Sequence, residues 1–246
     1  MRKFGLIGKN ISYSFSRNYF RNKFTNEKIS DATYVNFDLE DIVLFQEQTK
    51  KLTDIAGFNV TIPYKESIIP YLDKLNGKAR EIGAVNTIKI SKKGKFIGHN
   101  TDYYGFKKSL KPHLKEHHQK ALIFGTGGAS KDVAYALKQL NIDYGFVSRT
   151  SSTNVKYTYD SLTEDIIASH SVLINCTPLG THPNIEDCPD IPYQGISKKH
   201  ILFDLIYNPE QTKFLSMDKK REATIINGLQ MLELQAEKAW RIWNNH

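Results

Sequence analysis

Short apolar runs alternate with amphipathic stretches along the whole chain, which is the pattern of an α/β fold. Before residue 103, apolar runs bounded by turn residues predict strands at 3–8, 32–37, 55–60, 84–90 and 95–98. Amphipathic segments between these runs predict helices at 16–26, 40–49 and 63–74. Residues 1–102 are therefore expected to form one α/β domain.

A second region begins near Tyr103. Its apolar runs predict strands at 121–124, 144–148, 172–175, 201–205 and 224–226, with helices at 131–140 and 210–220. Strand, crossover helix and strand at this spacing favour a parallel sheet. The final segment predicts a long amphipathic helix at 229–243, with an apolar face made by Leu229, Leu232, Ala236, Ala239 and Trp240.

The composition narrows the class of protein. The chain has 246 residues, of which 40% are hydrophobic, enough for one large or two modest cores. No apolar run approaches the roughly 20 residues that cross a bilayer, and the N-terminal segment lacks the features of a signal peptide. Cys176 and Cys188 are too few for a disulfide framework, and metal-binding spacings are absent. We therefore expect a cytoplasmic protein with no membrane partner and no metal.

The formal net charge is +8, but the lysines and arginines are scattered. The densest groups, at 92–95, 107–111 and 219–221, look like solvated surface. Because neither an RNP motif nor a helix-turn-helix appears, we expect no nucleic-acid partner. A basic protein also attracts anionic small molecules, such as a phosphate-bearing cofactor or a carboxylate substrate.

The strongest motif is a glycine-rich turn at 121–130, where a buried strand runs into a predicted helix. Gly125 allows a tight turn, and Gly127 lets the backbone approach a pyrophosphate that the N–H groups of the helix start can hold. Ser130 stands where the G-x-G-x-x-G fingerprint has its third glycine, so this is a variant. The context favours a dinucleotide over a glycine turn without a ligand.

The next strand indicates which dinucleotide. NAD-binding versions usually place an acidic residue about 20 residues after the glycines, where it holds the ribose 2′-hydroxyl. Here the strand ends in Arg149 and Thr150, with no carboxylate at its tip. An arginine can clamp a 2′-phosphate with paired donors, so the sequence predicts NADP. The alternative is an exposed arginine at a strand end.

The first domain carries polar residues that packing does not demand. Ser12, Ser14 and Ser16 alternate in a loop and can present hydroxyls to a carboxylate, although Ser16 could instead cap the next helix. Pro63 suits the first turn of a helix, which would place Lys65 where the helix dipole disfavours a cation by about 0.3–1 kcal/mol. Lys65 then either extends its ammonium into solvent or has an acidic partner and a functional role.

Two further polar residues could complete such a site. Asp102 ends a loop that follows a predicted strand, and its carboxylate is the candidate partner of Lys65. Asn86 lies at a strand-like position, although a lone asparagine is more often a turn residue.

Taken together, these motifs resemble the shikimate dehydrogenase family over nearly the whole chain. The matching stretches occur in the family's order at 14–16, 59–65, 83–87, 100–102, 125–130, 175–180, 204–209 and 227–232, followed by Gln235. The resemblance implies a substrate-binding catalytic domain at 1–102, completed by the C-terminal helix at 229–246. It also implies a Rossmann-type parallel-sheet NADP-binding domain at 103–228.

The resemblance further implies an activity and its residues. The activity is reversible NADPH-dependent reduction of 3-dehydroshikimate to shikimate, in chorismate and aromatic amino-acid biosynthesis, by a monomer or homodimer. Lys65 would be the general acid and base, paired with Asp102. The substrate would be bound by Ser14, Ser16, Thr61, Asn86, Tyr207 and Gln235. The cofactor would be bound by Gly125, Thr126, Gly127, Gly128, Ala129, Ser130, Ser148, Arg149, Thr150, Thr177, Leu205 and Gly228.

The chain departs from the family at four positions. Tyr13 and Arg17 replace a frequent His and Pro around the serine pair, Ser148 replaces an Asn, and Thr181 replaces a frequent Met.

Three rivals stay open. A quinate/shikimate dehydrogenase of broader specificity often uses NAD, which Arg149 disfavours. A dinucleotide-binding sensor without catalysis would be expected to lack Lys65 or Asp102. A two-domain NADP dehydrogenase acting on a folate is disfavoured by the serine loop and Gln235.

Overall fold

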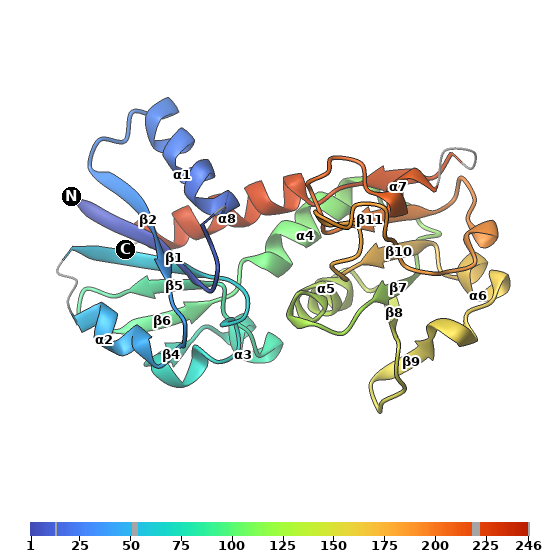
Figure 1. Cartoon of the computed structure of the whole chain (residues 1–246), viewed down its shortest axis with the longest axis horizontal. Coiled ribbons are helices and arrows are strands. Elements are labelled where there is room, and N and C mark those ends of the chain that lie inside the picture. Colours follow the sequence, from blue (N-terminus) through green and yellow to red (C-terminus); the bar gives the residue numbers. More distant parts are fainter. Residues whose placement is uncertain (13, 51–53, 218–221, 246) are drawn as a thin grey trace. The chain divides into compact units, whose positions relative to one another are not determined.

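The computed structural model describes residues 1–12, 14–50, 54–217 and 222–245. The chain divides into two compact units, one made of Met1–Thr101 with Gln235–His246 and the other of Asp102–Leu234. Each unit is built on its own six-stranded sheet (Figure 1). The units divide at 101/102 and 234/235, whereas the sequence placed the boundaries at 102/103 and 228/229. Tyr13, the group at 219–221 and the end of the predicted helix 210–220 lie outside the described residues.

The sheet of the first unit is mixed. Its strands are β1 (Arg2–Gly8), β2 (Ala32–Asp38), β3 (Ile55–Val60), β4 (Lys74–Leu75), β5 (Thr87–Ile90) and β6 (Phe96–His99), in the order β2-β1-β3-β5-β6-β4. β1 runs parallel to β2 and β3, whereas β5 is antiparallel to β3 and β6. The helices are α1 (Phe15–Asn26), α2 (Leu44–Lys50), α3 (Gly77–Ile82) and, from Gln235 on, α8 (Leu229–Asn244).

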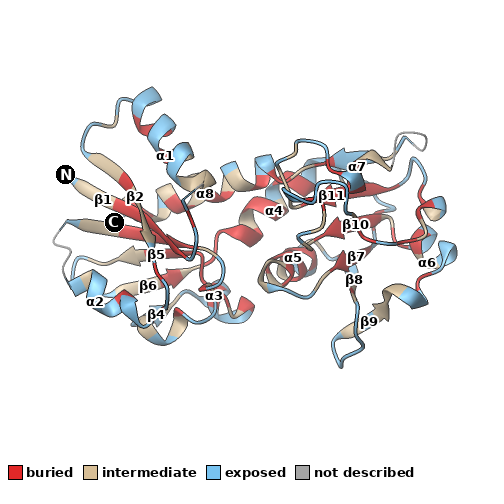
Figure 2. Cartoon of the chain, in the orientation of Figure 1, coloured by how far each residue is buried: buried red, intermediate tan, exposed pale blue. Residues whose placement is uncertain are grey.

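Both faces of this sheet are covered by a hydrophobic core. Successive side chains along each strand point to opposite faces, so one strand contributes to both cores. On β1, Phe4 and Leu6 join a core with α1 and α8, while Ile7 joins a second core with Phe45 of α2 and Ala79 of α3. Figure 2 shows the burial concentrated in the central strands of each sheet.

The C-terminal helix packs on the first unit, as the family resemblance implied. Ala236, Ala239 and Trp243 lie in the same core as Phe4, and the Trp243 indole N–H donates to the Ile88 carbonyl at 3.0 Å. Gly57 of β3 makes this possible, because a Cβ there would lie 2.4 Å from the indole nitrogen. The sequence predicted Ala236 and Ala239 on the buried face correctly, but Leu229 of that predicted face is exposed, and the prediction missed Trp243, which is more deeply buried than Trp240.

The sheet of the second unit is entirely parallel. Its strands are β7 (Lys120–Phe124), β8 (Asp143–Ser148), β9 (Val155–Thr158), β10 (Val172–Asn175), β11 (Ile201–Asp204) and β12 (Thr224–Ile226), in the order β12-β11-β10-β7-β8-β9. The helices are α4 (Asp102–Leu110), α5 (Gly128–Gln139), α6 (Glu164–Ser169) and α7 (Lys213–Ser216). Read from β9, this is the order of a doubly wound Rossmann sheet, and the predicted fold class is confirmed.

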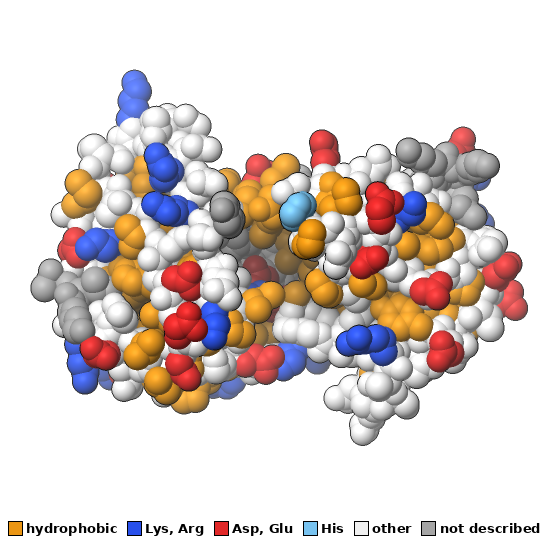
Figure 3. All heavy atoms as spheres, in the orientation of Figure 1, with side chains coloured by type: hydrophobic (Ala, Val, Ile, Leu, Met, Phe, Trp, Pro, Cys, Tyr) orange, Lys and Arg blue, Asp and Glu red, His pale blue; other side chains and the backbone are white. Residues whose placement is uncertain are grey.

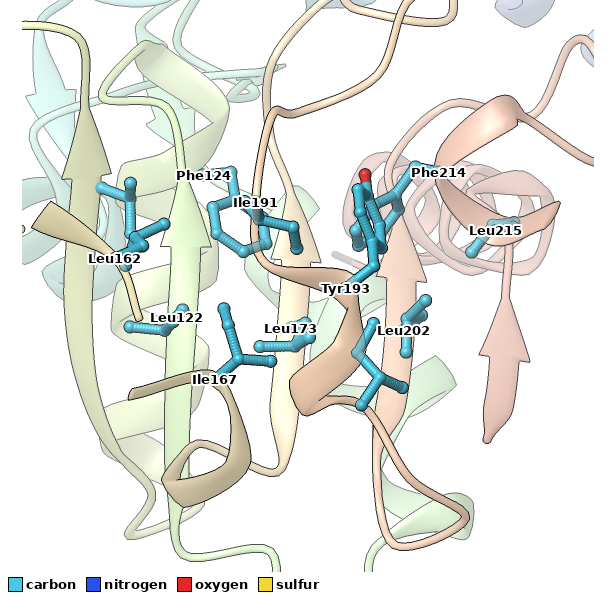
Figure 4. Packing of buried hydrophobic residues seen from close by; sticks show 12 residues of the cluster. Leu122, Phe124, Leu162, Ile167, Leu173, Ile191, Tyr193, Leu202, Phe214 and Leu215 are labelled. Atoms are coloured by element: carbon cyan, nitrogen blue, oxygen red, sulfur yellow. The ribbon is translucent and has the colours of Figure 1, made fainter. Parts of the chain in front are cut away.

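The core on one face of this sheet is formed by residues from neighbouring strands and the segments that cover them. Leu122, Leu173 and Leu202 lie side by side on β7, β10 and β11, beneath Ile167 of α6 and Phe214 of α7 (Figure 4). Continuous apolar strands of this kind are typical of a parallel sheet with both faces covered.

Some predicted elements were wrong. The helix expected at 63–74 is absent, because Pro70 would lie in its interior, where it lacks an N–H and clashes with the preceding turn. The chain instead forms turns, a 3-10 helix at Ile69–Tyr71 and the short strand β4. The strand expected at 84–90 begins only at Thr87. The sequence also missed α3, α4, α6 and β9.

On the face drawn in Figure 3, the Lys and Arg side chains of the described residues are scattered among acidic and apolar groups rather than gathered in one patch. No helix in the described part of the chain is both long and apolar enough to cross a membrane.

Candidate active site

The glycine-rich turn joins β7 to α5 in the second unit. Gly125 has φ +97°, a left-handed conformation that L side chains rarely adopt, and a Cβ there would lie 3.1 Å from the methyl group of Thr177. Gly127 is the N-cap of α5, and a Cβ built on it meets no atom within 4 Å. No side chain of the described residues caps this helix. The first N–H groups of the helix are thus available to an anion such as a pyrophosphate.

A cavity of about 560 Å³ opens beside this turn. It lies at the carboxyl ends of β7 and β10, the two strands between which the order of the sheet reverses, and ligands of open α/β sheets bind at such a point. The lining residues are Gly125, Thr126, Gly127, Ser148, Arg149, Tyr159, Cys176, Thr177, Pro178, Leu179, Cys188 and Asp190.

Six of the predicted cofactor residues line this cavity: Gly125, Thr126, Gly127, Ser148, Arg149 and Thr177. The other six, Gly128, Ala129, Ser130, Thr150, Leu205 and Gly228, are not among its lining residues. Gly128, Ala129 and Ser130 form the first turn of α5, so this helix begins three residues earlier than the sequence predicted. Ser130 bonds locally, since its hydroxyl donates to the Gly127 carbonyl at 2.6 Å.

Gly228 has a packing role that the sequence did not reveal. A glycine was expected there because a backbone must approach a nicotinamide ring. In the structure, a Cβ on Gly228 would lie 2.0 Å from the carbonyl oxygen of Leu205, and the Gly228 N–H donates to the Ile206 carbonyl at 3.0 Å. The close approach to the 205–206 backbone is by itself enough to require glycine.

The predicted substrate residues of the first unit centre on Asn86, which is 4% exposed. Its Nδ2 donates to the Thr101 hydroxyl at 2.9 Å and to Gln235 Oε1 at 3.4 Å. Its Oδ1 accepts the Thr101 N–H at 2.7 Å. Gln235, carried by α8, is 6% exposed. Asn86 and Gln235, 149 positions apart in sequence, are therefore hydrogen-bonded in one buried network.

The same network continues along the sheet to the serine loop. Asn59 donates to the Asn86 carbonyl at 3.2 Å and accepts the Tyr34 hydroxyl at 2.8 Å. Burial raises the pKa of the Tyr34 phenol well above its usual value, against the opposing effect of its hydrogen bond with Ser16. Tyr34, which lies on β2 four residues before the strand ends, was not predicted from the sequence.

The serine loop caps α1, but with the other serine. Ser14 is the N-cap, and its hydroxyl accepts the Arg17 N–H at 3.3 Å, whereas the sequence suggested that Ser16 could be the cap. The Ser14 hydroxyl also donates to Asn36 Oδ1 at 3.2 Å. The first turn of α1 contains no acidic residue, so the positive end of its dipole is not neutralised locally.

Lys65 lies in the turns that replace the predicted helix. The expected placement of its ammonium in the first turn of a helix was therefore wrong. Its carbonyl accepts the Val85 N–H at 2.8 Å, which fixes its backbone beside the segment that carries Asn86. Thr61, four residues earlier, donates its N–H to the Ile7 carbonyl at 2.9 Å.

Asp102 and Tyr207 belong to the second unit. Asp102 is 7% exposed and begins α4.

Comparisons with known proteins cover both units. The family model of the shikimate dehydrogenase substrate-binding domain matches residues 6–88. A shikimate dehydrogenase (NADP(+)) of Clostridium botulinum is 39% identical over 97% of this chain and 95% of its own length. This chain belongs to the shikimate dehydrogenase family.

Solved structures of the family agree with this assignment. A shikimate dehydrogenase of Aquifex aeolicus is 34% identical with a TM-score of 0.87, covering 99% of this chain and 92% of that one. Another shikimate dehydrogenase, solved in complex with NADP+, is 34% identical with a TM-score of 0.86, covering 99% and 90%. The predicted family and fold are thereby confirmed.

Against this family background, the cavity contains residues that sequence reasoning missed. Cys176, Pro178 and Leu179 belong to a stretch that carried the resemblance, so a signal for them existed. Tyr159 and Cys188 had none, because only the fold brings the segments after β9 and β10 to one cavity.

Tyr159 is distinctive among them. Its ring stacks on Phe124 at the end of β7, and its hydroxyl is buried with no hydrogen-bond partner among the described residues. Burial raises the pKa of Tyr159 to about 12, and nearby Arg149 partly offsets this shift.

Proposed function

We propose that this chain is an NADP-dependent shikimate dehydrogenase, which reversibly reduces 3-dehydroshikimate to shikimate in aromatic amino-acid biosynthesis. The observation that carries this proposal is the similarity to a shikimate dehydrogenase (NADP(+)) along 97% of the chain, because it includes both the glycine turn and the buried polar network. We infer a cytoplasmic enzyme whose partners are small molecules, as a monomer or homodimer.

NADPH, when bound, supplies the hydride that reduces the C3 carbonyl. We assign the pyrophosphate to the turn at Gly125–Gly127 and the first turn of α5, whose uncapped N–H groups support this role. Arg149 would hold the 2′-phosphate together with Thr150, both being exposed at the end of β8. Thr177, Leu205 and Gly228 would line the nicotinamide site.

The substrate carboxylate is assigned to Ser14 and Ser16. The position of Ser14 at the N-terminus of α1 supports this assignment, because a helix N-terminus favours an anion. Thr61, Asn86, Gln235 and Tyr207 are assigned to the ring hydroxyls and the carbonyl. The hydrogen bonds that hold Asn86 and Gln235 support a prearranged set of donors and acceptors.

Lys65 is the proposed general acid and base. Negative charge develops on the carbonyl oxygen during reduction, and the ammonium of Lys65 donates a proton to that oxygen. In the reverse direction Lys65 accepts the proton. Asp102 would orient Lys65 and bind a neighbouring hydroxyl of the substrate.

An absorbance assay of the reduced nicotinamide tests the proposal, with shikimate or quinate offered against NADP+ or NAD+. We expect the fastest turnover with shikimate and NADP+. Faster turnover of quinate would favour the dehydrogenase of broader specificity. Equal or better use of NAD+ would contradict the role of Arg149, and no turnover in any combination would contradict the proposal as a whole.

A further inference from the structure

A fully buried carboxylate, Asp204, lies at the end of β11, next to the strand whose following loop lines the cavity. Its Oδ2 accepts the Thr212 hydroxyl at 2.5 Å. Its Oδ1 accepts Asn175 Nδ2 at 3.1 Å and the Ile206 N–H at 3.1 Å. All three partners are neutral groups, so among the described residues an ionised carboxylate is held here by hydrogen bonds.

Asn175, at the end of β10, connects Asp204 to the cavity wall through hydrogen bonds of its side-chain amide. Its Oδ1 accepts both the N–H of Thr177 at 3.0 Å and the hydroxyl of Thr177 at 2.6 Å. Its Nδ2 donates to the Leu179 carbonyl at 3.3 Å as well as to Asp204. One side-chain amide therefore holds both ends of the 177–179 segment, which lines the cavity.

The orientation of that amide follows from the carboxylate. An ionised carboxylate only accepts hydrogen bonds, so the Nδ2 of Asn175 must face Asp204 and its Oδ1 must face Thr177. If the amide were flipped, Oδ1 of Asn175 would face the Asp204 carboxylate, two acceptors in contact. Its Nδ2 would then face the Thr177 N–H, two donors in contact. The hydroxyl of Thr212 has a matching polarity, because it accepts the Leu215 N–H at 3.4 Å and gives its proton to Asp204.

We propose that Asp204 is a positioning residue of the cofactor site, which acts through Asn175 to hold the 177–179 wall in the conformation that binds NADP. The inference rests on the proposed function, because it takes the cofactor to be the occupant of the cavity. It adds a role for Asp204, Asn175 and Thr212 that touches no ligand directly.

The ionisation of Asp204 offers a way to test this role. Burial raises the pKa of Asp204 to about 6, while the bonds from Thr212, Ile206 and Asn175 act in the opposite direction. The titratable groups that face Asp204 are the Cys176 thiol and the Tyr193 phenol, and burial raises the pKa of both. Asp132 in turn faces Cys176, whereas Cys188 and Asp190 face Tyr193. The thiol and the phenol therefore stay neutral near pH 6, where Asp204 changes charge.

The first experiment compares two helix-capping threonines of the same unit. Thr212→Val removes the N-cap of α7 and the hydrogen bond to Asp204, whereas Thr163→Val removes only the N-cap of α6. Both variants lose a cap, and Thr212→Val should lose more thermal stability because the buried carboxylate of Asp204 also loses a hydrogen bond. We expect Thr212→Val to raise the KM for NADP+ about five-fold and Thr163→Val to leave it unchanged. Equal KM values in the two variants would overturn the proposal.

The second experiment uses Asp204→Asn, which keeps the shape but removes the charge. We expect an about ten-fold higher KM for NADP+ at neutral pH, with kcat and the KM for shikimate within about two-fold of wild type. In wild type the KM for NADP+ should rise as pH falls through about 6, the value to which burial raises the pKa of Asp204. The cofactor phosphate also titrates near this pH, but equally with both proteins. The ratio of the two KM values should thus approach one at acid pH.

These experiments distinguish failure of the proposed function from failure of the role of Asp204. Wild-type protein without shikimate oxidation would defeat the proposed function. Active wild type with a constant ratio of KM values across pH would defeat the role of Asp204 alone. If Asp204→Asn does not fold, the Thr212→Val and Thr163→Val pair still decides.

Discussion

The two units differ in how far their predicted ligand-binding polar groups are buried. In the first, the predicted substrate residues Asn86 and Gln235 are buried and bonded to each other. In the second, the predicted cofactor residues Thr126, Gly127 and Arg149 are exposed around an open cavity. The difference matches the two kinds of ligand. Ring hydroxyls of a small substrate are distinguished by donors and acceptors held in place, whereas a pyrophosphate is bound by backbone N–H groups that must be reachable.

The comparison also separates residues whose loss should affect chemistry from those whose loss should affect affinity or stability. Lys65 is the proposed proton donor in the first unit, and Arg149 is the proposed phosphate ligand in the second. Asn59 and Tyr34 support the network without being assigned to the substrate.

Lys65→Met should have the largest effect. Without the general acid, kcat should fall by about a thousand-fold, while the KM for shikimate changes by only a few-fold, because the proton is needed in the transition state. Steady-state kinetics in both directions measure this. Lys92→Met, which removes an exposed lysine of the same unit, should be indistinguishable from wild type. A Lys65→Met enzyme within a few-fold of wild-type kcat would remove Lys65 from the mechanism.

Arg149→Gln should have the next largest effect, confined to one cofactor. Loss of a charge-assisted contact should raise the KM for NADP+ by about thirty-fold and leave the KM for NAD+ nearly unchanged, because NAD+ has no 2′-phosphate. The NAD+ measurement is the internal control. Equal losses with both cofactors would show that Arg149 holds the structure of the turn and not the phosphate.

Two tyrosines offer a matched test of the contrast between a bonded and an unbonded hydroxyl. Tyr34→Phe leaves Asn59 without its buried donor and should lower the free energy of unfolding of the protein by about 1–3 kcal/mol. Tyr159→Phe removes a buried hydroxyl that has no partner among the described residues, so stability should be unchanged or higher.

Urea unfolding of both variants measures the difference. A loss of stability in Tyr159→Phe as large as that in Tyr34→Phe would contradict the view that the Tyr34 hydroxyl stabilises a buried network and the Tyr159 hydroxyl does not.

The smallest expected effect is on the pH dependence of stability. Burial lowers the pKa of His99 to about 4, with Lys89 and Lys238 acting in the same direction. In the unfolded chain the value is about 6.5, so the unfolded state binds more protons between these limits and stability falls as pH falls through them. His99→Gln should flatten this part of the curve, measured by urea unfolding at several pH values. An unchanged slope would mean that His99 titrates normally.

The sequence predicted the framework of both units because apolar runs and glycines act locally. The turn at Gly125 was predicted correctly, since its positive φ and the uncapped helix after it follow from a short motif. The helix at 63–74 was wrong because its apolar spacing was given more weight than Pro70. Ser14 replaced Ser16 as the cap of α1, a choice that depends on where the helix begins and that two serines two positions apart leave open.

The parts that could not be predicted depend on contacts between distant segments. The Tyr34 hydroxyl on β2 donates to Asn59 on β3 across the intervening strand β1, and neither residue type by itself predicts this hydrogen bond. Gly228 was predicted only as a cofactor contact, and the structure adds a packing reason for glycine, the close approach of the Leu205 backbone. Tyr159 enters the cavity only because β9 lies beside β8 at the edge of the sheet.

Transfer of a label from substrate to cofactor tests the central claim most directly. Shikimate deuterated at C3 is incubated with NADP+ and the wild-type enzyme, and the reduced cofactor is analysed by mass spectrometry. The account predicts one deuterium per reduced nicotinamide, with 3-dehydroshikimate as the product. Reduced cofactor without deuterium, or no reduced cofactor at all, would contradict it.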